Sequence, residues 1–357
     1  MSSNPTDPAA ADEPATLRRR GRRGTGGVTL AEVAKLAGVA PITASRALNT
    51  PDQVSPAVLA RVRQAVEQVG YVPNLLAGGL ASSRSRLVAA VVPTIAGSVF
   101  LDAVQALTES LAESGYQLML GQSGYSESRE DALLEAIIGR RPDGIVLTGI
   151  VRSEHGRRRL LAAGIPVVET WDLTPTPIDM VVGFSHPAIG AAVAEYLHDR
   201  GRRRLAVITA DDGRARQRAA AFHDTAARLG LGGPQAGGTT CMMPAPTSLR
   251  SGRAGLAELL ARDADIDAVF CSSDLLALGV LTEAQARGIR VPQQLSVVGF
   301  GDLAFAADTY PALTTVRVDG AAIGRHAARF IVDRARQRPI EQRVVDIGFS
   351  ISRRQTA

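Results

Sequence analysis

Cysteine and long apolar runs are scarce in this chain of 357 residues, and each scarcity excludes a class of protein. Cys241 and Cys271 are the two cysteines, and neither has a Cys-x-x-Cys or His-x-x-His companion, which argues against a disulfide scaffold and a zinc site. No apolar run approaches the ~18 residues of a membrane span, and we find no secretory signal. We therefore expect a cytoplasmic protein with two reduced, buried thiols, no metal and no membrane contact.

Catalytic and nucleotide-binding motifs are missing as well. No expected strand leads into a G-x-G-x-x-G turn, and Walker A, G-x-S-x-G and His-Glu-x-x-His sequences are absent. The histidines are scattered along the chain: His155, His186, His198, His223 and His326. These absences predict a protein that is not an enzyme and that holds no cofactor.

Lysine is almost absent, since Lys35 is the only one and the other basic side chains are arginines. The chain has 40 basic and 35 acidic residues, a net charge of +5, and residues 1–86 alone contain 11 basic and 6 acidic ones. The whole positive excess thus lies in the N-terminal part. A basic N-terminal domain would be attracted to phosphates, and a neutral remainder is consistent with an independent second function.

The most informative stretch is 28–49, VTLAEVAKLAGVAPITASRALN. Thr29 and Glu32 stand at the spacing of a capping box, which starts a helix, and Gly38 supplies a permissive turn. Pro41 suits the first position of a second helix. Two short helices joined by a glycine turn predict a helix-turn-helix unit, which reads the major groove of DNA. An ordinary amphipathic helix pair is the alternative that these residues leave open.

The second helix of this unit has an outward face with DNA-contacting chemistry. Helical spacing turns Ala44, Ala47 and Leu48 inward and leaves five residues outside. These are Ile42, Thr43, Ser45, Arg46 and Asn49. A third helix over 56–69, capped by Ser55, completes a small head.

Three kinds of segment follow one another along the chain. Residues 1–27 predict a disordered basic tail, 28–73 the helical head, and 74–86 a linker. From 87 onward, buried-type strands alternate with amphipathic helices, a pattern typical of parallel α/β sheets. Two consecutive units of this kind predict two lobes and a ligand-binding cleft at the carboxyl ends of their strands.

The order of these parts resembles the LacI/GalR family of sugar-responsive repressors. The resemblance spans about residues 28–352 and rests on separated motifs in a fixed order: VTLAEVAKLAGVAPITASRALN, GYVPN, SSDLLALG and LSVVGFGD. Other segments are most similar to the gluconate-repressor subgroup of the family: VVPTIAGSVF, GYQLMLG, DGIVLT, AGIPVVE, DMVVGF and VDIGFSIS.

The resemblance implies an all-α helix-turn-helix DNA-binding head and an α/β, two-lobed, periplasmic-binding-protein-like effector domain over 87–352. Lobe 1 would comprise about 87–185 plus 311–337, and lobe 2 about 186–310 plus 338–352. The protein would be a homodimeric repressor of carbohydrate or sugar-acid genes on a palindromic double-stranded operator, released by a small effector, first of all gluconate. Another sugar, a ketoaldonate or a purine as effector, recruitment instead of release, and a solute-binding protein without DNA remain open.

At the DNA end, the resemblance implies that bases are read from the start and middle of the second helix, from Ala40, Pro41, Ile42 and Arg46. Arg46 can donate two parallel hydrogen bonds to a guanine, and Ile42 can meet a thymine methyl. Positions suited to phosphate or base-edge contacts are Thr43, Ser45 and Asn49. Ala40 departs from the Ser or Thr usual in the family, so a helix cap is lost.

The segment 74–81 is similar to the family's hinge helix, which folds on the operator and lies in the minor groove. Asn74 begins it, and Leu80 matches the family's wedge leucine. An apolar side chain inserted between base steps kinks the duplex.

At the effector end, Arg218 matches the position from which family members hold the ligand, and a guanidinium suits a carboxylate through paired hydrogen bonds. The other positions that the resemblance assigns to this site are Phe100, Thr148, Glu169, Trp171, Ser273 and Asp302. Gly301 replaces an acidic residue of sugar-binding members, which favours an anionic effector. Trp171 is as consistent with packing as with ligand stacking.

Overall fold

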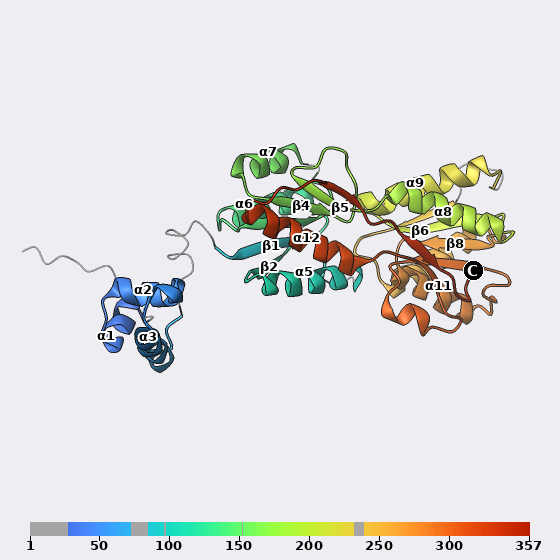
Figure 1. The fold of residues 1–357 in the computed structure, drawn as a ribbon. Helices are drawn as coiled ribbons and strands as arrows, with labels where there is room; N and C mark the ends of the chain where they lie inside the picture. The colour runs from blue at the N-terminus through green and yellow to red at the C-terminus, as the bar shows by residue number, and fades with distance from the viewer. Residues whose placement is uncertain (1–27, 73–84, 96–97, 152, 232–238) are drawn as a thin grey trace, which may run out of the picture. The chain divides into compact units, whose positions relative to one another are not determined.

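The residues that the computed structural model describes are 28–72, 85–95, 98–151, 153–231 and 239–357 (Figure 1). Contacts divide the chain into two compact units, Met1–Ser83 and Arg84–Ala357. The first contains a helical head and the second two α/β lobes, which is the predicted fold class. No helix in these described ranges is long and apolar enough to cross a membrane.

The head consists of α1 (Leu30–Ala37), α2 (Pro41–Asn49), a short 3₁₀ turn η1 (Pro51–Gln53) and α3 (Pro56–Val69). The predicted capping box is present at α1: the Thr29 N–H donates to the Glu32 carboxylate (2.7 Å), and Thr29 Oγ1 accepts from the Glu32 N–H (3.4 Å). Gly38 (φ 64°) ends α1 in the left-handed conformation. Helix α2 begins after Ala40 without a side-chain cap, as predicted.

Small side chains make the core of the head. Its buried residues are Val33, Ala34, Ala37, Ala44, Ala47, Val62 and Ala65. Leu48, also predicted to face inward, is half-buried against this core. Alanines at the contacts let the helices approach closely, so the roll of α2 about its axis, and therefore its outward face, is fixed by packing.

Lobe 1 is a parallel sheet with the order β11-β5-β4-β3-β1-β2. Its strands are β1 (Leu87–Val92), β2 (Gln117–Gln122), β3 (Gly144–Thr148), β4 (Val167–Thr170), β5 (Met180–Gly183) and β11 (Val344–Asp346). Its helices are α5 (Leu101–Glu113), preceded by η2 (Ser98–Phe100), α6 (Glu127–Ile138), α7 (Glu154–Ala163) and α12 (Gly320–Ala335). Alternate residues of β1 face opposite layers: Val88 packs with α5 and α12, and Ala89 with α6 and α7.

Lobe 2 repeats this plan with the strand order β12-β10-β9-β8-β6-β7, parallel except for β12. Its strands are β6 (Leu205–Ala210), β7 (Thr239–Met243), β8 (Ala268–Cys271), β9 (Ser296–Phe300), β10 (Thr314–Arg317) and β12 (Ser350–Ser352). Its helices are α8 (His186–Asp199), α9 (Gly213–Arg228), α10 (Leu249–Arg262), α11 (Asp274–Ala286) and the 3₁₀ turn η3 (Ala304–Ala307). Helices α8 and α9 pack on one face of the sheet, and α10 and α11 on the other.

The chain passes between the lobes three times, and the passages correct the expected division of its C-terminal part. The resemblance predicts 311–337 in lobe 1, but strand β10 pairs with β9 in lobe 2, and only α12 of that range packs in lobe 1, against α5. Likewise β11 pairs with β5 in lobe 1, while β12 lies in lobe 2. Strands of three or four residues carry too little periodicity to show which sheet they join; only their pairing decides it.

Glycines let helices of each lobe lie against one another at short range. A Cβ on Gly190 of α8 would stand 2.1 Å from the Arg218 carbonyl oxygen of α9, and one on Gly324 of α12 would stand 2.3 Å from the Ala103 carbonyl oxygen of α5. Real atoms do not approach this closely, so any larger residue must push the helices apart. The position of Arg218 in the second unit therefore depends on Gly190.

We expect Gly190→Ala to lower the free energy of unfolding by about 1–3 kcal/mol, because the added methyl group overpacks the α8–α9 contact. Denaturant unfolding followed by circular dichroism measures this. Gly139→Ala is the matched control, since the nearest atom to its Cβ, the Glu135 carbonyl oxygen, is 3.5 Å away. Equal losses in the two variants would contradict the explanation.

Candidate functional site

The outward face of α2 is open to solvent. Ile42 is 64% exposed, and Ala40, Pro41, Arg46 and Asn49 are exposed as well. The remaining two predicted positions, Thr43 and Ser45, are half-buried. An isoleucine this exposed contributes little to the head's own stability, so its apolar surface is available to a partner.

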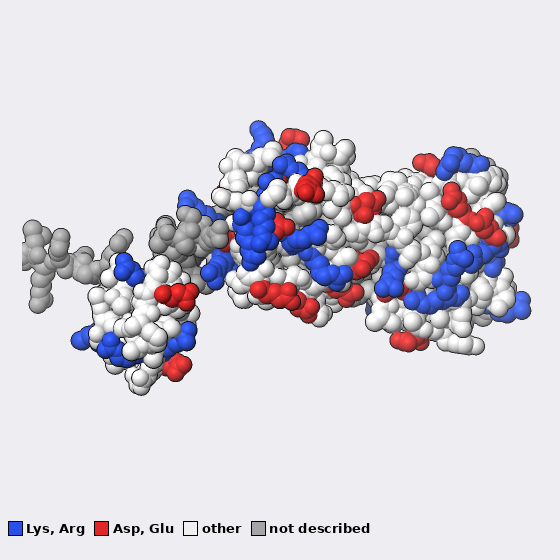
Figure 2. Space-filling model, in the orientation of Figure 1, with Lys and Arg blue, Asp and Glu red and all other residues white. Residues whose placement is uncertain are grey.

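The charge of the described head is small. Residues 28–72 contain four basic and three acidic side chains, and Figure 2 shows both signs on the visible face of the head. Most of the positive excess of residues 1–86 therefore falls in 1–27 and 73–86. Asn74 and Leu80, the two predicted hinge residues, also lie outside the described residues.

A cavity of about 420 Å³ lies between the two lobes. Among the residues expected from the sequence, Phe100 and Trp171 of lobe 1 and Arg218 and Ser273 of lobe 2 line its wall. Other lining residues, which the sequence does not single out, include Tyr125, His186, Arg214, Ser272 and Phe300. The cavity thus combines aromatic walls with two guanidinium groups and one carboxylate, that of Asp212.

Arg218 is 5% exposed and is held by uncharged groups. Its Nη1 lies 2.9 Å from His186 Nδ1, and its Nη2 donates to the Ser272 carbonyl oxygen (3.2 Å). The guanidinium carbon stands 4.0 Å from the centre of the Phe300 ring, a cation–π distance. Burial lowers the pKa of Arg218 to about 10, which still leaves it charged at neutral pH.

His186 has one possible tautomer in this arrangement. Arginine can only donate, so Nδ1 of His186 accepts from Arg218, and the proton sits on Nε2, which donates to the Trp171 carbonyl oxygen (2.8 Å). Burial, with the charges of Arg218 and Arg214, lowers the pKa of His186 to about 2. A neutral imidazole therefore links the start of α8 in lobe 2 to the end of β4 in lobe 1.

Trp171 both packs and lines the cavity. It is 4% exposed, its backbone adopts φ 64°, and its ring meets those of Phe100 (5.0 Å) and Phe184 (5.9 Å) edge to face. A bulky residue with positive φ is rare, so the surrounding contacts must hold it there. The aromatic series continues from Phe184 to His186 (4.9 Å).

A second cavity of about 410 Å³ adjoins the first, with Tyr125, Asp212 and Arg214 in the walls of both. Thr148, the fifth expected effector residue found in the cleft, lines this second cavity. Its other charged lining residues are mainly carboxylates: Glu127, Glu130, Asp172 and Asp211, with Arg216. Burial, and then Asp131 and Glu127, raise the pKa of Glu130.

Glu169 and Asp302, which the resemblance placed beside the effector, line neither cavity. Glu169 is fully buried and accepts from the Val151 N–H (3.1 Å) and the Ile178 N–H (2.8 Å), so it fixes two loops of lobe 1. Asp302 instead pairs with Arg354 (2.7 Å) and accepts from the Ser352 hydroxyl (2.9 Å).

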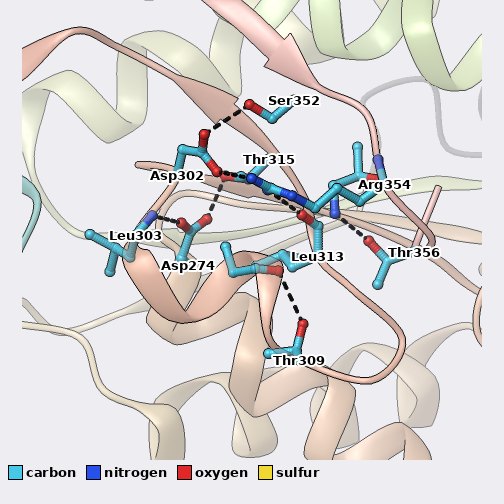
Figure 3. A network of polar contacts seen from close by, with 11 residues as sticks. Asp274, Asp302, Leu303, Thr309, Leu313, Thr315, Ser352, Arg354 and Thr356 are labelled. Carbon is cyan, nitrogen blue, oxygen red and sulfur yellow. Dashed lines mark hydrogen bonds and ion pairs between the residues drawn. The ribbon is translucent and has the colours of Figure 1, made fainter.

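Figure 3 shows the network of polar contacts that contains the Asp302–Arg354 ion pair. Asp274, the first residue of α11, is completely buried and accepts from the Thr315 hydroxyl (2.5 Å) and the Leu303 N–H (2.8 Å). Leu303 also lines the first cavity. The Asp274 and Asp302 carboxylates thus support the loop at the cavity wall from behind rather than facing a ligand.

The lowered pKa of His186 has a consequence for stability. Free histidine titrates near 6.5, whereas His186 stays neutral down to about 2, so between these values the unfolded chain binds a proton that the folded chain does not. We expect stability to fall as the pH drops from about 7 to about 5, and His186→Gln, which cannot titrate, to lose less. Melting temperatures at both pH values measure the difference. The surface variant His155→Gln should keep the wild-type loss, and an identical loss in His186→Gln would refute the assignment.

Two family models match the chain. The model described as "Bacterial regulatory proteins, lacI family" covers residues 29–74, which is the helical head, and the model described as "Periplasmic binding protein-like domain" covers 194–357. Their order along the chain agrees with the order of the two units in the structure.

Similar proteins are transcriptional regulators. The chain is 38% identical to the HTH-type transcriptional regulator GntR of Pseudomonas aeruginosa, over 96% of this chain and 99% of the relative. It is 33% identical to CelR of Thermobifida fusca, over 86% and 91% of the two chains. A solved LacI family regulator from Silicibacter pomeroyi superposes with a TM-score of 0.86 at 31% identity, over 92% of this chain and 99% of that one. The chain therefore belongs to the LacI family of bacterial transcriptional regulators, which are DNA-binding proteins and not enzymes.

Proposed function

We propose that this protein is a homodimeric repressor that a small polyhydroxy acid, with gluconate as the first candidate, releases from a palindromic operator. The main support for an acidic effector is the cavity between the lobes, where two arginines, Arg214 and Arg218, lie among aromatic rings. One buried and one half-buried guanidinium group in the same cavity favour an anionic ligand. The identity to a regulator named GntR supports the choice of gluconate.

The operator role rests on the geometry of the head. Helix α2 presents Ile42 and Arg46 on one exposed face, which suits a thymine methyl and a guanine edge in the major groove. A head of three short helices covers only a half-site. Twofold operators match twofold proteins, so we infer a homodimer with one head on each half-site.

Release by the effector follows from differential binding. The cavity has walls from both lobes, so a ligand that contacts both of them binds a closed arrangement better than an open one. If the operator-bound dimer prefers the other arrangement, the two ligands oppose each other by the same free energy. Recruitment instead of release would reverse the sign of this coupling.

A neutral sugar is the second candidate effector. The adjoining cavity offers hydroxyl and carboxylate acceptors such as Thr148 and Glu130, which suit sugar hydroxyls. The two cavities together, about 420 and 410 Å³, have room for more than one sugar ring.

Arg46→Ala should reduce the preference for operator over random DNA by about 10-fold or more, because a bidentate arginine–guanine contact discriminates by ~1–3 kcal/mol. Weak, salt-sensitive binding should remain, since phosphate contacts carry no sequence information. Competition titrations at several salt concentrations measure the ratio. An unchanged ratio would show that Arg46 does not read a base.

Arg218→Ala should bind operator like the wild type and lose its response to gluconate, because the head is a separate unit while the cavity loses a buried cation. Calorimetry with gluconate and operator binding with and without it are the measurements. Circular dichroism checks that the variant folds.

Two outcomes of this experiment separate the parts of the proposal. If gluconate binds the wild type no better than glucose does, the acid effector is wrong. If the Arg218 variant still releases operator on adding gluconate, only the role of Arg218 is wrong.

A further inference from the structure

We propose that Arg214, rather than Arg218 alone, selects an acid over a neutral sugar, by donating to the effector's carboxylate across the gap between the lobes. The inference rests on the proposed acid effector and names a residue that sequence patterns do not indicate. Arg218 then serves as a fixed cationic platform beside it. The argument depends on how the donors of the two guanidinium groups are used.

Two nitrogens of the Arg218 guanidinium group already contact acceptors of the protein. Its Nη1 and Nη2 each contact an acceptor, His186 Nδ1 and the Ser272 carbonyl oxygen, and one face is covered by Phe300. Only its Nε is buried without an acceptor among the described residues. A group held on three sides is positioned well, but it has little freedom to follow a ligand as the lobes close.

Arg214, unlike Arg218, has a guanidinium group with few contacts to acceptors of the protein. It is half-buried in the first turn of α9, and its Nη1 is buried without a hydrogen-bond acceptor among the described residues. The ion pairs found in the described parts of the chain do not include it, in contrast to its neighbour Arg216, which pairs with Asp211. A buried donor left unsatisfied costs free energy, which a ligand carboxylate can recover.

The Arg214 side chain also reaches from lobe 2 to lobe 1. Its guanidinium carbon stands 5.4 Å from the centre of the Phe100 ring, and a Cβ on Gly149, which follows β3, would lie 3.5 Å from its Nη1. Both of these residues belong to lobe 1. An anion bound by Arg214 therefore contacts a cation that already spans the two lobes.

The charges that face Arg214 explain why it stays available. Asp212 is its nearest acidic neighbour in sequence, and Asp212 Oδ1 is occupied as the cap of α9, accepting from the Arg214 and Ala215 N–H groups (3.0 Å each). Burial and the charge of Asp212 raise the pKa of Tyr125, so that phenol stays neutral. Burial, and then Asp131 and Glu127, raise the pKa of Glu130 on the second-cavity side, against the opposing charge of Arg214.

Arg214 and Arg218 also repel each other. They are four residues apart on α9, so they share a face of the helix, and both line the first cavity. After burial and the opposing effect of Asp212, Arg214 is a cause of the lowered pKa of Arg218. A carboxylate between the two guanidinium groups would relieve this repulsion, whereas a neutral sugar would not.

The test compares gluconate with glucitol, a neutral polyol of the same carbon number, in calorimetry on the full-length protein. We expect Arg214→Gln to weaken gluconate binding by about 10-fold or more, the scale of one charge-assisted hydrogen bond, and to change glucitol binding by less than about 2-fold. Arg214→Lys, which keeps the charge without the fork, should fall between. Arg228→Gln is the matched control, because it removes one exposed charge from the same helix outside both cavities.

Melting temperature provides a second readout without ligand. Arg214→Gln should not lower it relative to Arg228→Gln, because the variant removes an unpaired charge and a repulsion. A clear decrease would mean that Arg214 is structural, which would overturn the inference.

The outcomes distinguish this inference from the proposed function. A wild type without preference for gluconate over glucitol refutes the acid effector. If the wild type has the preference and Arg214→Gln keeps it, the acid effector stands and the role of Arg214 is wrong. An equal loss of both ligands also contradicts the inference, since the contact would then not depend on charge.

Discussion

The buried guanidinium of Arg218 is the constraint on which the cleft between the lobes depends. A buried charge is costly unless polar groups surround it, and the contacts found for Arg218 are a neutral imidazole, a carbonyl oxygen and an aromatic face. This requires His186 to accept through Nδ1 and therefore to donate through Nε2 to Trp171. The residue that provides this carbonyl oxygen, Trp171, has a left-handed backbone (φ 64°). Arg218, His186 and Trp171, three residues from three segments of the second unit, are thus linked by the contacts of one charge.

The placement of His186 connects this constraint to lobe movement. It is the first residue of α8, directly after the first passage of the chain between the lobes, and α8 packs on α9 through Gly190. A ligand that binds the α9 arginines therefore acts on the helix that begins at the passage. Small displacements at such a joint are amplified into motion of whole lobes, because packed helices move as rigid bodies. The operator-binding head is a separate unit, so its sequence preference and the effector response can change independently.

Local patterns predicted the elements well and the cleft in part. Capping at Thr29 and Glu32, the turn at Gly38 and the alternation of strands and helices depend on neighbouring residues, so a sequence displays them. The resemblance located Phe100, Thr148, Trp171, Arg218 and Ser273 in the cleft. It misplaced Glu169 and Asp302, and no pattern indicated His186 or Arg214, because their roles depend on partners 15 or more residues away, such as Trp171 for His186 and Phe100 for Arg214. The predicted lobes of β10 and β11 were wrong for the same reason, because the strand that each one pairs with is distant in the sequence.

The two misplaced carboxylates explain the sign of the charge in the cavity. The Glu169 carboxylate accepts hydrogen bonds from backbone amides of lobe 1, and the Asp302 carboxylate forms an ion pair with Arg354. Neither of them therefore neutralises the positive charge of the α9 arginines. The carboxylates that do face the cleft, such as Glu130 and Asp172, line the adjoining cavity. The aromatic cavity therefore has two guanidinium groups and one carboxylate, Asp212, in its wall, whereas most carboxylates of the cleft line the adjoining cavity. A ligand with a carboxylate at one end and hydroxyl donors along the rest matches both sides in a single orientation, which a neutral sugar cannot do.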